Sequence, residues 1–168
     1  MSTLALTRRA GLAALGAIFI PAALGVRGAK AQPGARFRTI AVDVRADVGE
    51  PTVSWLQQAL PGAIAQALGA DYAPGDRNGA TLVARIDYLY LGPSSGGTGP
   101  AGASQDTIKG VLIVRGARGV AEDVPLRAIS FYYPMSVDQA LPEQAYHDRV
   151  TALAQVFAGW VPRELGLG

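Results

Sequence analysis

Residues 108–133, IKGVLIVRGARGVAEDVPLRAISFYY, decide the fold that this sequence predicts. Apolar and polar side chains alternate along 108–115 and again along 124–133, with a turn between the two runs at 116–123. Such alternation is typical of β-strands that have one buried face. The stretch therefore predicts two neighbouring strands joined by a short connection.

Two further alternating runs precede this pair, at 37–45 and 81–91, and predict two more strands. The segment 92–107 consists almost entirely of Gly, Ser, Pro and Ala with little charge, which favours a flexible hairpin loop without fixed structure. The sequence thus predicts four strands and one long Gly-rich loop.

Two segments have helical spacing of their apolar residues. In 52–68 they recur every three or four positions, Gly69 suits the end of the helix, and Pro61-Gly62 predicts a kink or two short helices. In the last helix, from 142 to about 161, Pro142 suits the first position and Pro162 limits the end. Its apolar stripe is predicted to form core: Tyr146, Val150, Leu153, Phe157 and Trp160.

The resulting fold class is α+β, with the order β-α-β-β-β-α and a four-stranded, mostly antiparallel sheet whose two helices pack on one face. In element order over 37–161, the chain resembles small envelope proteins such as the lipopolysaccharide-assembly lipoprotein and the auxiliary component of some ABC transporters. The resemblance implies an accessory role in the cell envelope. The lipidation Cys of those families is missing here, because the chain has no Cys at all.

Residues 1–31 resemble an export signal of the twin-arginine (Tat) type. Thr7-Arg8-Arg9 opens a weakly apolar run, and Ala29-Lys30-Ala31 provides a small-x-small cleavage site. Gly11 replaces the usual Phe of the Tat pattern, so a Sec leader and a retained anchor remain alternatives. The interpretation predicts cleavage before Gln32, a single domain over 32–168, and a periplasmic, envelope-associated location without a membrane span in the mature chain.

Charge and composition exclude several classes of function. Of the 15 Lys and Arg residues, four lie in 1–31, whereas all 13 acidic residues lie beyond it. The mature chain therefore carries 11 positive and 13 negative charges, a net charge of −2, and the high pI is no sign of nucleic-acid binding. One His and no Cys provide no recognisable metal-ligand set, and no cofactor site is predicted.

Two short motifs match catalytic or nucleotide-binding patterns without the required context. Residues 92–96 fit G-x-S-x-G around Ser94, and Asp123 or Asp138 with His147 would complete a hydrolase order. Residues 97–102 fit G-x-G-x-x-G. Both motifs need a helix directly afterwards, and a strand is predicted instead. The sequence therefore assigns no catalytic residue.

The strand alternation separates two sheet faces. We expect the uncharged face, which includes Leu82, Ala84, Ile86, Tyr88 and Tyr90, to be covered by the helices. The opposite face, which also includes Leu89, mixes apolar side chains with charges, a composition typical of partner surfaces. The predicted partner-binding residues are Arg85, Val111, Ile113, Arg115, Arg127, Ile129, Phe131 and Tyr133.

The leading hypothesis is a non-catalytic accessory or binding protein that uses this face for a protein partner or a second copy. The alternative is a small-ligand-binding protein or hydrolase with its site near the 92–107 loop. That site would use aromatic residues at its rim, namely Tyr88, Tyr90, Tyr132 and Tyr133.

Overall fold

The computed structural model describes residues 36–93, 104–116, 121–132 and 142–167 of the 168-residue chain. The predicted export signal at 1–31 lies outside these residues. The elements follow one another as β1 (Phe37–Val44), α1 (Thr52–Leu68), a short 3-10 turn η1 (Gly69–Asp71), β2 (Ala80–Leu91), β3 (Ser104–Arg115), β4 (Ala121–Tyr132) and α2 (Pro142–Glu164).

The four strands form one mixed sheet in the order β1-β2-β3-β4. The strands β2, β3 and β4 are antiparallel neighbours, whereas β1 runs parallel to β2. The parallel pair is connected through α1, because parallel neighbours need a crossover rather than a hairpin. The predicted α+β class, element order and mostly antiparallel sheet are confirmed.

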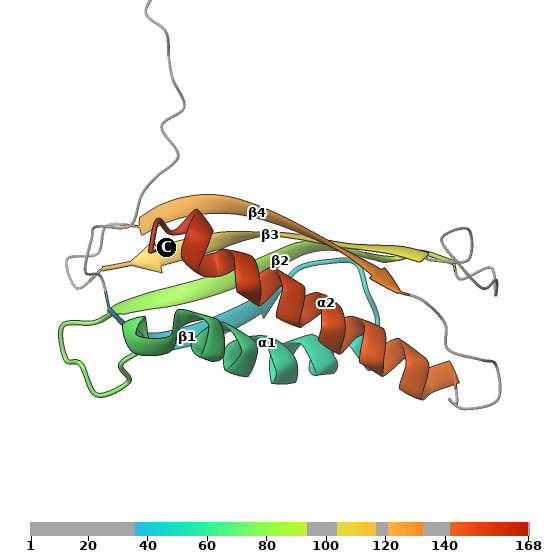
Figure 1. The fold of residues 1–168 in the computed structure, drawn as a ribbon, viewed down its shortest axis with the longest axis horizontal. Helices are drawn as coiled ribbons and strands as arrows, with labels where there is room; N and C mark the ends of the chain where they lie inside the picture. The colour runs from blue at the N-terminus through green and yellow to red at the C-terminus, as the bar shows by residue number, and fades with distance from the viewer. Residues whose placement is uncertain (1–35, 94–103, 117–120, 133–141, 168) are drawn as a thin grey trace, which may run out of the picture.

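Both helices lie on the same face of the sheet (Figure 1). Leu56, Leu60, Ile64 and Leu68 of α1 follow one another at intervals of four residues and are buried. The core between helices and sheet is apolar: it includes Phe37, Leu82, Ala84, Ile86, Ile108, Leu112, Leu126, Val150, Leu153, Phe157 and Leu165. No helix in the described segments is long and apolar enough to cross a bilayer.

The helices differ from the sequence prediction at their prolines. Helix α1 continues through Pro61 as one element, and α2 includes Pro162 and ends at Glu164. The N–H of Gly69 donates to the carbonyl of Ala65, and its φ of +53° lies in the region that favours glycine, which confirms the predicted end of α1. The prediction that the apolar stripe of α2 forms core is wrong for two of its residues, because Tyr146 is 48% exposed and Trp160 is 40% exposed.

Strand β3 begins four residues earlier than predicted. Residues 104–107, which the sequence analysis assigns to the Gly-rich loop, pair with β4 and bury Ser104, Asp106 and Thr107. The loop prediction is therefore wrong for residues 104–107. These residues continue β3, although their side chains are polar and suggest a loop. Residues 94–103 lie outside the described residues.

A β-bulge between Ile86 and Tyr88 reverses the predicted facing of the second half of β2. Tyr88 and Tyr90 are 44% and 49% exposed, whereas Leu89 packs against the core. Their predicted positions are therefore wrong, because one extra residue shifts all later side chains to the other face. Gly110 faces the bulge, and a Cβ at this position would collide with the carbonyl oxygen of Arg85.

Candidate functional site

The candidate site is the sheet face opposite the helices, here named the open face. Figure 1 shows that neither helix lies on it. Its side chains alternate along each strand with the core residues, except at the bulge, where Asp87 and Tyr88 are both exposed. They include Asp43, Arg45, Arg85, Asp87, Tyr88, Tyr90, Lys109, Val111, Ile113, Arg115, Asp123, Pro125, Arg127, Ile129 and Phe131.

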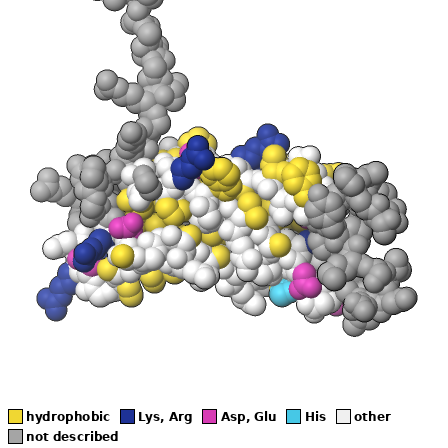
Figure 2. Space-filling model, viewed as in Figure 1, with side chains coloured by type: hydrophobic (Ala, Val, Ile, Leu, Met, Phe, Trp, Pro, Cys, Tyr) yellow, Lys and Arg dark blue, Asp and Glu magenta, His cyan; other side chains and the backbone are white. Residues whose placement is uncertain are grey.

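The structure brings seven of the eight predicted partner-binding residues together on this face. Phe131 is 60% exposed and Ile129 is 37% exposed, while Val111 and Ile113 of the neighbouring strand are partly buried. The eighth, Tyr133, lies outside the described residues. Hydrophobic and basic side chains lie side by side along the upper rim of the molecule in Figure 2, where Figure 1 shows β4.

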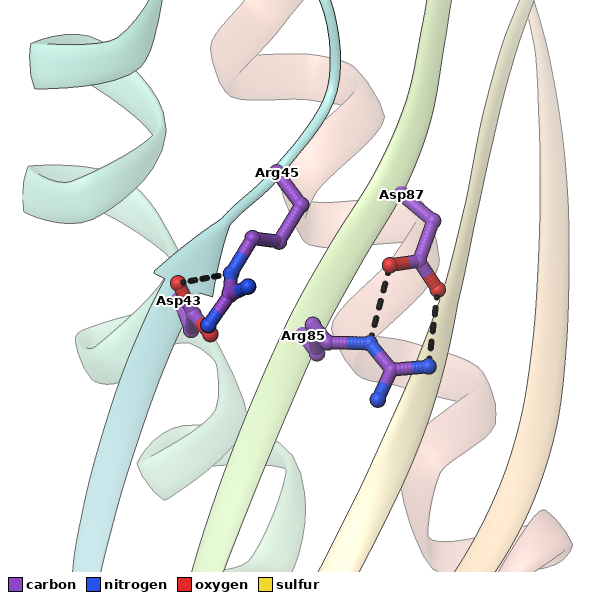
Figure 3. Close-up of polar contacts among 4 residues, drawn as sticks. All are labelled: Asp43, Arg45, Arg85 and Asp87. Carbon is purple, nitrogen blue, oxygen red and sulfur yellow. Dashed lines mark hydrogen bonds and ion pairs between the residues drawn. The ribbon is translucent and has the colours of Figure 1, made fainter.

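The β1–β2 half of the open face carries four charges that neutralise one another (Figure 3). The Arg45 Nε lies 2.9 Å from the Asp43 Oδ2, and the Arg85 Nε lies 2.8 Å from the Asp87 Oδ1. The hydrogen bond to Asp43 raises the pKa of Arg45, and that to Asp87 raises the pKa of Arg85. Asp43 is also opposite Arg85 in the register. This half therefore already provides a carboxylate for each guanidinium.

The β3–β4 half is different, because two cations are directly opposite each other. Lys109 is paired with Arg127 in the register, and both side chains are exposed. The Lys109 Nζ lies 4.8 Å from the centre of the Tyr88 ring, a cation–π contact. Like charges at directly opposite positions destabilise a strand pair. With Arg115 as a third cation and Asp123 as the described acid, this half of the open face has an excess of positive charge.

A buried ion pair behind the sheet was missed by the sequence analysis. The Arg149 Nε of α2 donates to the Asp106 Oδ2 of β3 at 3.0 Å, and a second nitrogen also contacts this carboxylate. The side chains are 5% and 2% exposed. The Arg149 Nη2 also donates to the carbonyl of Gly92 at 2.6 Å, while the N–H of Gly92 donates to the Asp106 Oδ1 at 3.0 Å.

This cluster fastens α2 to the start of the β2–β3 connection. A signal for it exists in the sequence, because Asp106 continues the alternation Ile108, Gly110, Leu112 toward the N-terminus, and Arg149 precedes Leu153 by one helical turn. Both positions therefore point toward the core. A buried charge is stable only beside an opposite charge, so a buried Asp on β3 and a buried Arg on α2 predict each other as an ion pair. The Arg149 guanidinium also lies 5.6 Å from the centre of the Tyr146 ring on α2. The cluster lies on the helix side of the sheet and does not involve the open face.

The residues considered for hydrolase chemistry do not come together. Asp123 lies on the open face of β4, whereas His147 lies on α2, with its ring edge-on to Trp55 of α1 at 5.2 Å. The sheet separates them. Ser94 and Asp138 lie outside the described residues. In the described segments, no group of three His, Asp or Glu side chains is placed to hold a metal ion.

Comparisons with known proteins do not assign this chain to a family. No family model matches it. No curated protein matches it either. Among solved structures, the PelC dodecamer from Paraburkholderia phytofirmans has a TM-score of 0.44 at 12% identity, covering 81% of this chain and 94% of that one.

Two further solved structures are similar in the same range. A minor lipoprotein from Acinetobacter baumannii has a TM-score of 0.40 at 13% identity, with 76% of this chain and 94% of that chain covered. The rare lipoprotein B from Shewanella oneidensis has a TM-score of 0.39 at 9% identity, with 76% and 93% covered. Likeness at this level concerns the general chain fold and transfers no function.

Proposed function

We propose that this protein is an exported, non-catalytic accessory or binding protein of the bacterial envelope that acts through protein–protein contact at the open face. The observation that carries the proposal is the exposure of Phe131, whose side chain is 60% accessible on a face that no described helix covers. Ile129 of the same strand and Tyr90 of β2 extend this apolar area.

Charge patterning supports the same surface. Aromatic side chains and Arg are enriched in the centres of protein interfaces, whereas paired surface ions contribute little. On the open face, the β1–β2 charges are already paired. The exposed large apolar and aromatic side chains lie on β4 and at the end of β2, namely Ile129, Phe131, Tyr88 and Tyr90. A partner that covers β4 and this end of β2 would remove the apolar area from water without breaking the existing ion pairs.

The export signal supports the proposed location. A twin-arginine leader at 1–31 would deliver the mature domain to the periplasm, where accessory proteins of the envelope act. The fold contributes a small rigid platform: the buried Arg149–Asp106 pair and the apolar core hold the sheet, and the open face remains available for contact.

Site-specific photo-crosslinking in living cells tests the proposal. A photoreactive amino acid replaces Phe131 on the open face, and a matched variant carries it at Gln66, an exposed position of α1. We expect a discrete crosslinked band from position 131 and none from position 66. Mass spectrometry then determines whether the crosslinked chain is another protein or a second copy. Absence of any protein crosslink from position 131, with the photoreactive protein folded and exported, would contradict the proposal.

A further inference from the structure

Two exposed charges of opposite sign lie on the open face of β4, and Asp123 interacts with Arg85 of β2 only at longer range than an ion pair. Asp123 and Arg127 stand two residues on either side of Pro125, all on the open face. Neither makes an ion pair within the described part of the chain. Four residues of a strand span about 13 Å. Asp123 and Arg127 of one chain therefore have opposite charges but are too far apart to form an ion pair with each other.

A twofold axis brings these charges together. When two copies of a strand face each other about an axis through Pro125, Arg127 of each copy lies against Asp123 of the other. Interfaces between identical chains with twofold symmetry must be self-complementary in this way. We propose that the occupant of the open face is a second copy of this chain, packed face to face about an axis at Pro125. This inference rests on the proposed function and names its partner.

The surrounding residues suit this arrangement. Val111 is opposite Pro125 in the register, and Ile113 is opposite Asp123, so the axis passes through an apolar centre with the two ion pairs beside it. The partner's carboxylate also relieves the repulsion between Lys109 and Arg127. The same line through Pro125 and Val111 crosses β2 at Arg85, which is opposite Val111, so the two copies of Arg85 face each other across the axis and are neutralised by their own Asp87.

Edge-to-edge pairing of two β4 strands would give the same charge register but is less favourable. Strand β4 is at the edge of the sheet, and Pro125 in its middle has no N–H to donate. Proline in an edge strand interrupts the ladder that a neighbouring strand would need. Face-to-face packing uses the apolar side chains and requires no backbone hydrogen bonds from β4.

Charge exchange between two variants tests this arrangement. Asp123→Arg and Arg127→Asp are purified separately, one with a mass tag, and association is measured by analytical ultracentrifugation and native mass spectrometry. Each variant alone places like charges at both contacts, so self-association is expected to weaken by about tenfold or more. In the mixture, the unaltered Arg127 of the first variant meets the unaltered Asp123 of the second. The arginine introduced at position 123 likewise meets the aspartate introduced at position 127, so heterodimers are expected at the wild-type affinity.

The controls separate this inference from the proposed function. Arg77→Asp reverses a charge in the exposed turn before β2 and is expected to leave self-association unchanged. Thermal unfolding checks that each variant is folded. A monomeric wild-type protein, or a mixture that does not restore association, would overturn the second-copy proposal. A crosslink from position 131 to a different protein would then still support the proposed function.

Discussion

Arg149 and Asp106 are 43 positions apart in the chain and form a nearly inaccessible ion pair between α2 and β3. Two guanidinium nitrogens contact the carboxylate, and Gly92 completes the cluster through both its N–H and its carbonyl. The chain has no disulfide, because it has no Cys. This pair is therefore a principal polar connection between the last helix and the sheet.

Asp106→Ala is expected to destabilise the protein by about 3–5 kcal/mol, because it leaves the Arg149 guanidinium buried without its carboxylate. Urea unfolding followed by circular dichroism measures the change in the free energy of unfolding. The double variant Asp106→Leu with Arg149→Met removes both charges and is expected to recover much of the loss. If the loss of stability in the double variant equals the sum of the losses in Asp106→Leu and in Arg149→Met measured singly, the pair does not act as a unit.

Gly110→Ala is expected to destabilise the protein by about 1–3 kcal/mol, because its Cβ collides with the backbone of β2 at the bulge. Gly62→Ala in α1 is the matched control: no atom lies within 4 Å of its added Cβ, and helix propensity favours Ala. Thermal unfolding of both variants provides the comparison. Equal stability of Gly110→Ala and the wild type would show that β2 and β3 are not in close contact here.

Phe131→Glu is expected to leave the fold intact, because the side chain is already 60% exposed. It is also expected to reduce partner contact by at least about tenfold, since it places a carboxylate in an apolar contact area. Crosslinking from a photoreactive residue at Ile129 measures this loss, with Gln66→Glu on α1 as the control for added charge. Unfolding by Phe131→Glu would mean that the chain itself covers this face.

The hairpin connection is expected to tolerate replacement of residues 94–103 by Asn-Gly. The register ends with Leu91 opposite Asp106, and its continuation would bring 93 opposite 104, so a two-residue turn can join them. Loop closure depends only weakly on length, and the melting temperature should change little. Replacing 93–105 instead removes buried Ser104 and should cost stability. A large loss of stability when only residues 94–103 are replaced would favour the alternative hypothesis, a ligand site near this loop.

Substitution of Arg8 and Arg9 by Lys is expected to retain the precursor inside the cell if export uses the twin-arginine route. Cell fractionation and immunoblotting measure the distribution, and N-terminal sequencing of the exported wild type is expected to begin at Gln32. A leader with unaltered arginines and a changed Thr3, outside the Thr7-Arg8-Arg9 pattern, serves as the control. Normal export of the Lys variant would support a Sec leader instead.

The spacing of apolar residues, every second position in the strands and every third or fourth in the helices, was sufficient to predict the four strands, both helices and the open face. It failed wherever one residue or one distant partner decided the outcome. The bulge after Ile86 moved Tyr88 and Tyr90 to the open face, because a single unpaired residue changes no local composition. The polar residues Ser104 and Asp106 suggested a loop. Arg149, far away in sequence, provides the buried partner of Asp106 and so allows a buried strand there.

The parallel pairing of β1 with β2 has a consequence for the order of folding. Strands β2, β3 and β4 are consecutive antiparallel neighbours and can form from contacts close in sequence. Strand β1 can join only after the chain has passed through the whole of α1, and such long-range pairing is intrinsically slow. We therefore expect the three-strand meander to form first and β1 to dock last.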